Sequence, residues 1–360
     1  MKIIAYYLPQ FHPIPENDVW WGEGFTEWTN VKNAIPLFKG HRQPVEPGEL
    51  GYYDLRDPEV RIKQAELAGE HGIHGFCYWH YWFGNGKTLL EKPLQEVLKT
   101  GKPDFPFCLG WANESWTGIW HGSPEKTLME QRYPGEKDIH HHFDYLLAAF
   151  LDDRYIKIDN KPFFLVYKPD NHPQLKLLTQ IFHKRAIKEG FNGMHFVATN
   201  VQESWNLDEH GFSANAPSYH NGIIWQKKNG LFNRLKRKLW EDNRKDPTLP
   251  EHLYTYREAS RYFLPGTNRN GTIYPTVVPN WDNSPRSGKR GVILHQSKPE
   301  LYGEHLQNAL AFAAKGKDNI VMLKSWNEWA EGNYLEPDKQ WGRAYLETTR
   351  DTVHEFNKSL

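Results

Sequence analysis

The sequence has little cysteine, no long apolar run and no excess of charge of either sign. Its two cysteines, Cys77 and Cys108, each lie inside an apolar run, and neither a disulfide framework nor a zinc-ligand spacing is present. We therefore expect two buried free thiols, no metal and no cofactor. Lysine plus arginine and aspartate plus glutamate both total 44 in 360 residues, so the formal charge of zero argues against a general nucleic-acid-binding protein.

The sequence does not indicate a membrane-spanning or secreted chain. A membrane-spanning helix needs about 20 predominantly apolar residues, and no stretch of this sequence meets that requirement. The first residues, Met-Lys-Ile-Ile-Ala-Tyr-Tyr-Leu, form a strand-like run and lack the apolar core and cleavage site of a signal peptide. We expect a cytoplasmic protein without a transmembrane segment.

Aromatic side chains, in contrast, are abundant, at 14% of the chain with 15 tryptophans. Most of them must fill the core. Tryptophan and tyrosine also offer flat apolar faces with one polar group, so the surplus is typical of a cleft that stacks on sugar rings.

Eight strand-like runs recur along the chain, and several are nearly continuously apolar, as is typical of strands covered on both faces. Helix-like segments lie between many of them, including one that begins at Asp57-Pro58 and ends at Gly72. Strand followed by helix, repeated about eight times, predicts a (β/α)8 barrel. The strand-like runs cover 2–8, 75–79, 105–111, 163–167, 194–200, 214–219, 274–281 and 320–326.

We predict a single α/β domain over 1–360, a (β/α)8 TIM barrel with long loops after its strands and an insertion at 221–270. The alternative, a doubly wound nucleotide-binding fold, needs a glycine-rich loop after an early strand, whereas Pro-Gln-Phe-His-Pro follows the first run here. The insertion predicts either a solvated helical excursion or a basic flap for an acidic glycan or membrane surface. Its basic residues include Lys227, Lys228, Arg234, Lys236, Arg237 and Lys238.

Functional residues of a barrel gather where its strands end, and these ends are rich in aromatic and polar side chains. About half of the run 78–83 should be packing, because strand residues alternate faces, and His80 could be a structural hydrogen bonder. Glu114 could cap a helix or pair with an arginine, and Asp282 could pair with Arg286. We predict a sugar-binding rim made of Tyr6, Tyr7, Trp79, His80, Trp111, Asn113, Glu114, Trp116, Tyr167, Tyr219, Trp281, Asp282, Trp326 and Asn327.

Two glutamates, Glu328 and Glu331, follow the eighth run in the segment Lys-Ser-Trp-Asn-Glu-Trp-Ala-Glu-Gly, residues 324–332. An ordinary alternative is a solvated helix start with acidic residues near its positive end. Residues three apart on a helical turn have Cβ atoms about 5–6 Å apart. That separation is close to the roughly 5–5.5 Å between the carboxyl groups of retaining glycoside hydrolases. We therefore predict a catalytic pair whose shared site drives the two pKa values apart.

Several segments resemble the WbsX-type family, which is found with bacterial polysaccharide and O-antigen genes. The matching segments are Glu-Asn-Asp-Val-Trp-Trp-Gly-Glu-Gly-Phe-Thr-Glu-Trp-Thr-Asn-Val at 16–31, Gly-Phe-Cys-Tyr-Trp-His-Tyr-Trp-Phe at 75–83, Trp-Ala-Asn-Glu-Ser-Trp-Thr at 111–117 and Pro-Asn-Trp-Asp-Asn-Ser-Pro-Arg at 279–286. That family is similar to glycoside hydrolase family 99, barrel endo-α-mannosidases with a Trp-Asn-Glu-x-x-Glu-Gly motif after the eighth strand. Residues 326–332 match this motif.

The resemblance implies a hydrolase of a bacterial polysaccharide or mannose-containing glycan. It also implies that Glu328 deprotonates the substrate's own 2-hydroxyl, which attacks the anomeric carbon, and that Glu331 is the general acid and later activates water. The WbsX name carries a glycosyltransferase label, so a transferase of O-antigen, capsular polysaccharide or lipopolysaccharide synthesis is the main alternative. The Asp-x-Asp motif common in sugar-nucleotide transferases is missing from the sequence. A non-catalytic carbohydrate-binding barrel is the third possibility.

Overall fold

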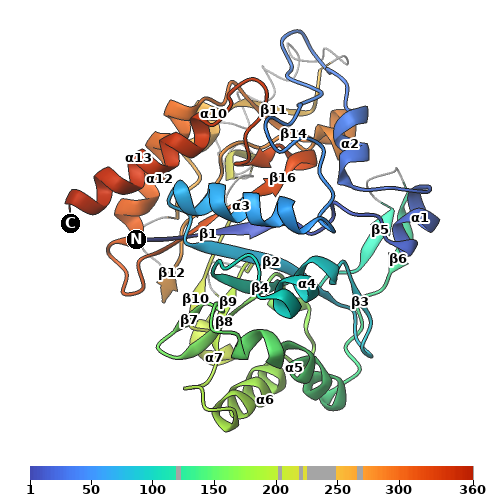
Figure 1. Cartoon of the computed structure of the whole chain (residues 1–360), viewed down its shortest axis with the longest axis vertical. Coiled ribbons are helices and arrows are strands. Elements are labelled where there is room, and N and C mark those ends of the chain that lie inside the picture. The colour runs from blue at the N-terminus through green and yellow to red at the C-terminus, as the bar shows by residue number, and fades with distance from the viewer. Residues whose placement is uncertain (119–122, 202–204, 219–221, 225–248, 266–270, 360) are drawn as a thin grey trace, which may run out of the picture.

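Parallel strands at the centre of the molecule alternate along the chain with helices that lie outside them (Figure 1). The computed structural model describes residues 1–118, 123–201, 205–218, 222–224, 249–265 and 271–359. In chain order, the strands of the main sheet are β1 (Lys2–Tyr7), β2 (Gly75–Trp82), β4 (Phe107–Trp111), β8 (Lys161–Val166), β9 (His195–Ala198), β10 (Ala214–Asn215), β12 (Thr272–Ile273), β13 (Thr276–Val277) and β15 (Ile320–Leu323).

These strands close into a barrel whose seventh strand is divided into two short strands, β12 and β13. On one side β12 pairs with β10, and on the other β13 pairs with β15. Tyr274 N donates to Asn215 O over 2.9 Å, and Met322 N donates to Pro275 O over 2.9 Å, so the backbone ladder continues across the gap. Because β1 pairs with both β15 and β2, the circuit is complete, and the predicted (β/α)8 barrel is confirmed.

The barrel core follows from the apolar runs. All eight residues of β2 and all five of β4 are buried, as expected for strands covered on both faces. Cys77 and Cys108 lie at paired positions of these strands and are buried and free, which confirms the prediction of free thiols. The sixth and seventh strands are shorter than predicted. Tyr219, at the end of the predicted sixth run, lies outside the described residues.

The predicted helical segments are confirmed around the barrel. α3 (Pro58–Glu70) begins after Asp57, whose side chain accepts a hydrogen bond from Glu59 N, with proline in the first turn. The apolar residues that recur at helical spacing in α12 (Pro299–Ala313), among them Tyr302, Leu306 and Leu310, are buried. The other helices that flank the sheet are α4 (Lys92–Thr100), α5 (Glu136–Leu151), α6 (Leu175–Lys188), α7 (Leu207–His210), α10 (Tyr256–Ser260) and α13 (Ala344–Ser359).

Long loops after the strands carry the remaining elements. The loop after β1 holds α1 (Pro15–Trp21) and α2 (Glu27–Asn33), and the loop after β4 holds the hairpin of β5 (Trp116–Gly118) and β6 (Ser123–Met129). After β15, an antiparallel pair of short strands encloses a 3-10 turn. The small elements are β3 (Thr88–Leu89), β7 (Lys157–Ile158), η2 (Pro169–Asn171), α11 (Ser284–Ser287), η3 (Gly288–Arg290), β16 (Asn327–Glu328), η4 (Trp329–Glu331) and β17 (Asn333–Tyr334).

Only part of the predicted insertion at 221–270 belongs to the described residues. There β11 (His252–Thr255) pairs in parallel with β14 (Val292–His295), and α10 follows. The basic residues Lys227, Lys228, Arg234, Lys236, Arg237 and Lys238 lie outside the described residues. Within the described ranges, none of the helices combines the length and apolar character that crossing a membrane requires.

Candidate functional site

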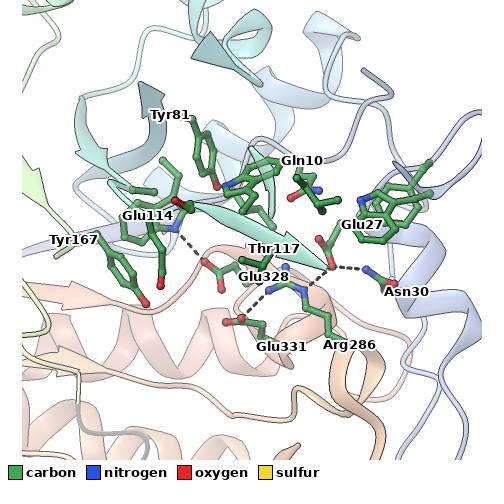
Figure 2. A pocket seen from close by; sticks show the side chains of 18 of the residues that line it. Gln10, Glu27, Asn30, Tyr81, Glu114, Thr117, Tyr167, Arg286, Glu328 and Glu331 are labelled. Carbon is green, nitrogen blue, oxygen red and sulfur yellow. Dashed lines mark hydrogen bonds and ion pairs between the residues drawn. The ribbon is translucent and has the colours of Figure 1, made fainter. Parts of the chain in front are cut away.

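A cavity of about 450 Å³ lies at the carboxyl ends of the barrel strands, the edge where barrel enzymes hold their active sites. Figure 2 shows polar side chains from several loops that point into it. The predicted site residues that line the cavity are Trp79, Glu114, Trp116, Tyr167, Glu328 and Glu331. Lining residues that were not predicted include Gln10, Trp21, Glu27, Asn30, Tyr81, Arg286 and Lys324.

Glu328 and Glu331 lie together at the base of this cavity (Figure 2). Oε1 of Glu328, in β16, accepts a hydrogen bond from Trp79 Nε1 over 3.1 Å. Oε1 of Glu331, in η4, accepts from Arg286 Nη1 over 2.6 Å, and its Oε2 accepts from Asn333 Nδ2 over 3.2 Å. Both carboxyl groups are therefore buried and held in place by donors from other segments, unlike acidic residues at a solvated helix start.

The glycine of the motif is required by the turn that carries Glu331. Gly332 has φ +63°, in the left-handed region that favours glycine. A Cβ at this position would lie 2.8 Å from Asp282 N, which itself donates to Glu331 O over 2.7 Å. The close approach of these two loops fixes the position of Glu331 in the cavity.

The buried carboxylate of Glu336 holds this turn in position. Glu336 accepts hydrogen bonds from Trp329 Nε1 over 2.6 Å, Tyr53 Oη over 2.8 Å and Gln64 Nε2 over 2.6 Å. Burial raises the pKa of Glu336 to about 7, although these donors oppose the rise. The network joins the turn to α3 and to the loop after β1, so the position of Trp329, next to Glu328, is determined by distant segments.

The surroundings of Glu328 and Glu331 affect their two carboxyl groups differently. Burial raises the pKa of Glu328 to about 8, and the negative charge of Glu331 adds to the rise. Although burial opposes it, the charges of Glu27 and Glu331 raise the pKa of Arg286. Glu328 is therefore easier to protonate than an exposed glutamate, whereas the carboxyl group of Glu331 accepts a hydrogen bond from the Arg286 guanidinium.

Lys324 places a second positive charge in the cavity. Its Nζ lies 5.1 Å from the centroid of the Trp281 ring. Although burial opposes it, Glu328 and Glu331 raise the pKa of Lys324, which stays charged and in turn lowers the pKa of Glu328.

Several predicted rim residues lie in the core and do not line the cavity. Tyr7 is 1% exposed and donates from its hydroxyl to Gln64 Oε1 over 2.7 Å. Trp111 donates from Nε1 to Trp82 O over 3.0 Å, and Trp326 is fully buried. Tyr6 does not line the cavity and stacks on Trp79, with ring centroids 5.0 Å apart.

Two predicted asparagines hold the backbone of strand ends. The Asn327 side chain accepts from Leu8 N over 2.7 Å and donates to Leu8 O over 3.0 Å. The Asn113 side chain makes the corresponding pair of bonds with Lys168 N and O, at 2.8 and 2.7 Å. These contacts give both amides a structural role at the strand ends, and neither side chain lines the cavity.

Asp282 and Trp281 do not line the cavity of the glutamate pair, although Asp282 N donates to Glu331 O. Trp281 belongs to a separate apolar cluster with Tyr256 and Phe263. Asp282 Oδ2 accepts from Gln43 Nε2 and contacts His41 Nε2, each at 2.8 Å, and lines a second cavity of about 530 Å³. The suggested pairing of Asp282 with Arg286 is therefore wrong, and Glu114 pairs with Lys168 rather than with an arginine.

His80 belongs to a buried histidine cluster and not to the cavity. Its Nε2 lies 2.9 Å from Nε2 of His142, which stacks on Trp82, and both His142 and His172 pack against Trp111. Burial lowers the pKa of His80 to about 3 and that of His172 to about 4, and lowers the pKa of His142 further below its usual range. All three histidines are neutral in the folded protein near pH 6.

This cluster predicts that the free energy of unfolding falls as the pH drops below about 6.5. Below pH 6.5 the histidines of the unfolded chain take up protons, whereas those of the folded chain stay neutral. The free energy of unfolding therefore decreases between pH 6.5 and about pH 4, by up to about 1.4 kcal/mol per pH unit for each histidine. Urea unfolding at pH 7.5 and pH 5.0 measures the loss. The double variant His80→Gln, His142→Leu should lose less between these values than the wild type. Equal losses would show that the cluster does not carry the effect.

The residues that sequence reasoning missed come mainly from the segments 16–31 and 279–286. Glu27 and Arg286 lie in these motifs, but nothing in the local pattern pairs them across the chain. In the described part of the chain, no group of three or more His, Cys, Asp or Glu side chains is arranged to hold a metal ion. The lining of the cavity itself offers carboxyl groups, cations and aromatic faces.

Comparison with known proteins gives a sequence family and a fold. The model of a family described as glycosyltransferase WbsX matches residues 3–349. The chain is 37% identical over 357 residues to a protein named uncharacterized protein WxcX from Xanthomonas campestris pv. campestris strain B100, and likewise to its counterpart from strain ATCC 33913. Each match covers 98% of this chain and 49% of the relative, so the chain spans about half the length of these relatives.

Similar solved structures include the GH99 endo-alpha-mannosidase from Bacteroides thetaiotaomicron in complex with bis-tris-propane. That match has a TM-score of 0.61 and 14% identity, and covers 99% of this chain and 98% of the other. A protein described as glycoside hydrolase-like matches with a TM-score of 0.58 and 15% identity, covering 98% and 93%. At such identities the likeness establishes a shared barrel fold, and the predicted similarity to both families is confirmed.

Proposed function

The chain belongs to the WbsX family, and from the contents of its cavity we propose that it is a glycoside hydrolase of a bacterial polysaccharide or mannose-containing glycan. The observation that carries the proposal is the pair Glu328 and Glu331, which lies in an aromatic-lined cavity where Glu328 accepts a hydrogen bond from Trp79 and Glu331 accepts one from Arg286. Glycoside cleavage needs an acid at the leaving oxygen and a second carboxyl group at the sugar. The likeness to a GH99 endo-alpha-mannosidase supports this class of substrate.

The closeness of the two glutamates favours retention of anomeric configuration. Inverting enzymes separate their carboxyl groups by about 6.5–9.5 Å to admit a water molecule. Here Glu328 and Glu331 are three residues apart, line the same cavity, and the charge of Glu331 raises the pKa of Glu328, which supports a shorter separation. Retaining chemistry fits this arrangement better.

The roles of the two glutamates are assigned as the family resemblance implies. Glu328 takes the proton of the substrate's 2-hydroxyl, O2 bonds to the anomeric carbon, and Glu331 gives its proton to the departing oxygen. Glu331 then takes a proton from water, which opens the new ring at the anomeric carbon, and Glu328 returns its proton to O2. The first step needs a proton on Glu331 and none on Glu328, so a proton that the free site holds on Glu328, whose pKa burial raises, must first pass to Glu331.

A sugar-nucleotide transferase is the second candidate, supported by the description of the matching family. Purified protein incubated with bacterial polysaccharides and mannose-containing oligosaccharides should release reducing ends. Incubation with sugar nucleotides and an acceptor should release no nucleotide above the background of a Glu328→Gln, Glu331→Gln double variant. Nucleotide release by the wild type, without new reducing ends, would replace the hydrolase with the transferase.

A further inference from the structure

Glu27 is a third carboxylate of the cavity, and the function proposed above does not use it. It lies at the start of α2, is 2% exposed, and belongs to the motif 16–31. Its Oε1 accepts from Arg286 Nε over 2.8 Å and from Asn30 Nδ2 over 3.1 Å. Because Arg286 Nη1 also donates to Glu331, one guanidinium binds two carboxylates from distant segments (Figure 2).

Because the Arg286 guanidinium is shared with Glu27, it stabilises the ionised form of Glu331 less strongly. A guanidinium bound to a single buried carboxylate strongly favours the ionised form of that carboxylate. With Arg286 on Glu331 alone, the proton of the pair would stay on Glu328, and the acid at the leaving oxygen would be missing. Glu27 brings a second negative charge to the same guanidinium and so reduces the positive potential that Glu331 experiences.

We propose that Glu27 is a positioning residue for the glutamate pair: by sharing Arg286 with Glu331, it keeps Glu331 basic enough to receive the proton that the pair holds. This inference rests on the proposed function, because Glu331 must be protonated before it can protonate a leaving oxygen. In the step that Glu27 assists, an O–H bond breaks at Glu328 and forms at Glu331. The total charge of the pair is unchanged.

Among the described residues near the pair, three phenols and Lys324 keep constant charge over the relevant pH range, and Glu114, which also lines the cavity, pairs with Lys168. Burial raises the pKa of Tyr6, Tyr81 and Tyr167, so these phenols stay neutral. Lys324 stays positive, because Glu328 and Glu331 raise its pKa against the effect of burial. A titration observed at the pair between pH 6 and 9 therefore reports the shared proton and the charges of Glu27 and Arg286.

The structure offers a probe of this proton that needs no substrate. Trp79 Nε1 donates to Glu328 Oε1, so the indole resonance of Trp79 in ¹⁵N-labelled protein should move as the pair titrates. The resonance is identified by its loss in Trp79→Phe. In the wild type its midpoint should lie near pH 8, where burial places the pKa of Glu328.

Glu27→Gln should move this midpoint down by at least about half a pH unit, because removal of a nearby negative charge weakens proton binding by the pair. Glu27→Ala should move it in the same direction, while Glu27→Asp, which keeps the charge, should stay closer to the wild type. Glu23→Gln, an equal change of charge at an exposed position, should leave it unmoved. Dispersion of the other indole resonances checks folding. An unmoved midpoint in folded Glu27→Gln and Glu27→Ala overturns the proposal.

Activity gives a separate test. Glu27→Gln should lower kcat on a glycan with a poor leaving group and spare an aryl glycoside, with little change in KM. A raised KM with an unmoved titration would make Glu27 a substrate contact and contradict the positioning role. Absence of any cleavage by the wild type would refute the proposed function, whereas the titration would still decide whether Glu27 controls the proton of the pair.

Discussion

Glu331→Gln should reduce cleavage of an unactivated glycan by about 10²–10⁴-fold, the usual contribution of a general acid. The same variant should keep much more of its first-step activity on an aryl glycoside, because a phenolate leaves without needing a proton. Glu328→Gln should be impaired on both substrates, since activation at the sugar is needed whatever group departs. Initial rates on a matched pair of glycan and aryl glycoside measure the difference.

Two results would revise the roles of the glutamates. The reverse leaving-group pattern would exchange them and make Glu328, whose pKa burial raises, the acid. Efficient hydrolysis of a 2-deoxy substrate would exclude attack by the 2-hydroxyl and leave direct attack by Glu328 as the better account. Full activity of both variants would remove the pair from the catalytic site altogether.

Arg286→Met should lower the free energy of unfolding by about 3–5 kcal/mol, the range for breaking a buried ion pair by removing one partner. The substitution leaves Glu27 and Glu331 buried near each other without their shared cation. Part of this cost can be relieved if one carboxylate takes up a proton. The loss should therefore be larger at pH 8 than at pH 5 when both are measured by urea unfolding.

The matched control for this prediction removes one of the two buried carboxylates that Arg286→Met leaves without their cation. Glu27→Gln introduced into Arg286→Met should recover part of the lost stability, because one buried carboxylate replaces two. Loss below about 1 kcal/mol in the single variant, with no recovery in the double variant, would show that the carboxylates obtain other partners or water.

The barrel can be predicted from the sequence because its determinants are local and periodic. The apolar face of α12 repeats at helical spacing, and the buried residues of β2 and β4 form continuous runs. The split of the seventh strand around Tyr274 and Pro275 could not be predicted. It depends on which neighbours, β10 and β15, the two short pieces meet when the barrel closes.

The site can be predicted only in part, because a strand end does not reveal which way its side chains point. Glu328, Trp79 and Tyr167 reach the cavity, but Tyr7, at the end of β1, points into the core. A shift of one position along a strand turns a side chain from the cavity to the core, or from the core to the cavity. Glu27 and Arg286 meet only because the loop after β1 folds over the barrel, and no sequence periodicity records that contact.

The central claim is that Glu328 and Glu331 together hydrolyse a glycosidic bond, and cleavage in H₂¹⁸O tests it most directly. The account predicts that the wild type releases a reducing end labelled with ¹⁸O at the anomeric carbon, formed first with the anomeric configuration of the substrate. The Glu328→Gln, Glu331→Gln double variant should release none. Unlabelled products that form only when an acceptor is present, or equal labelling by the double variant, would contradict it.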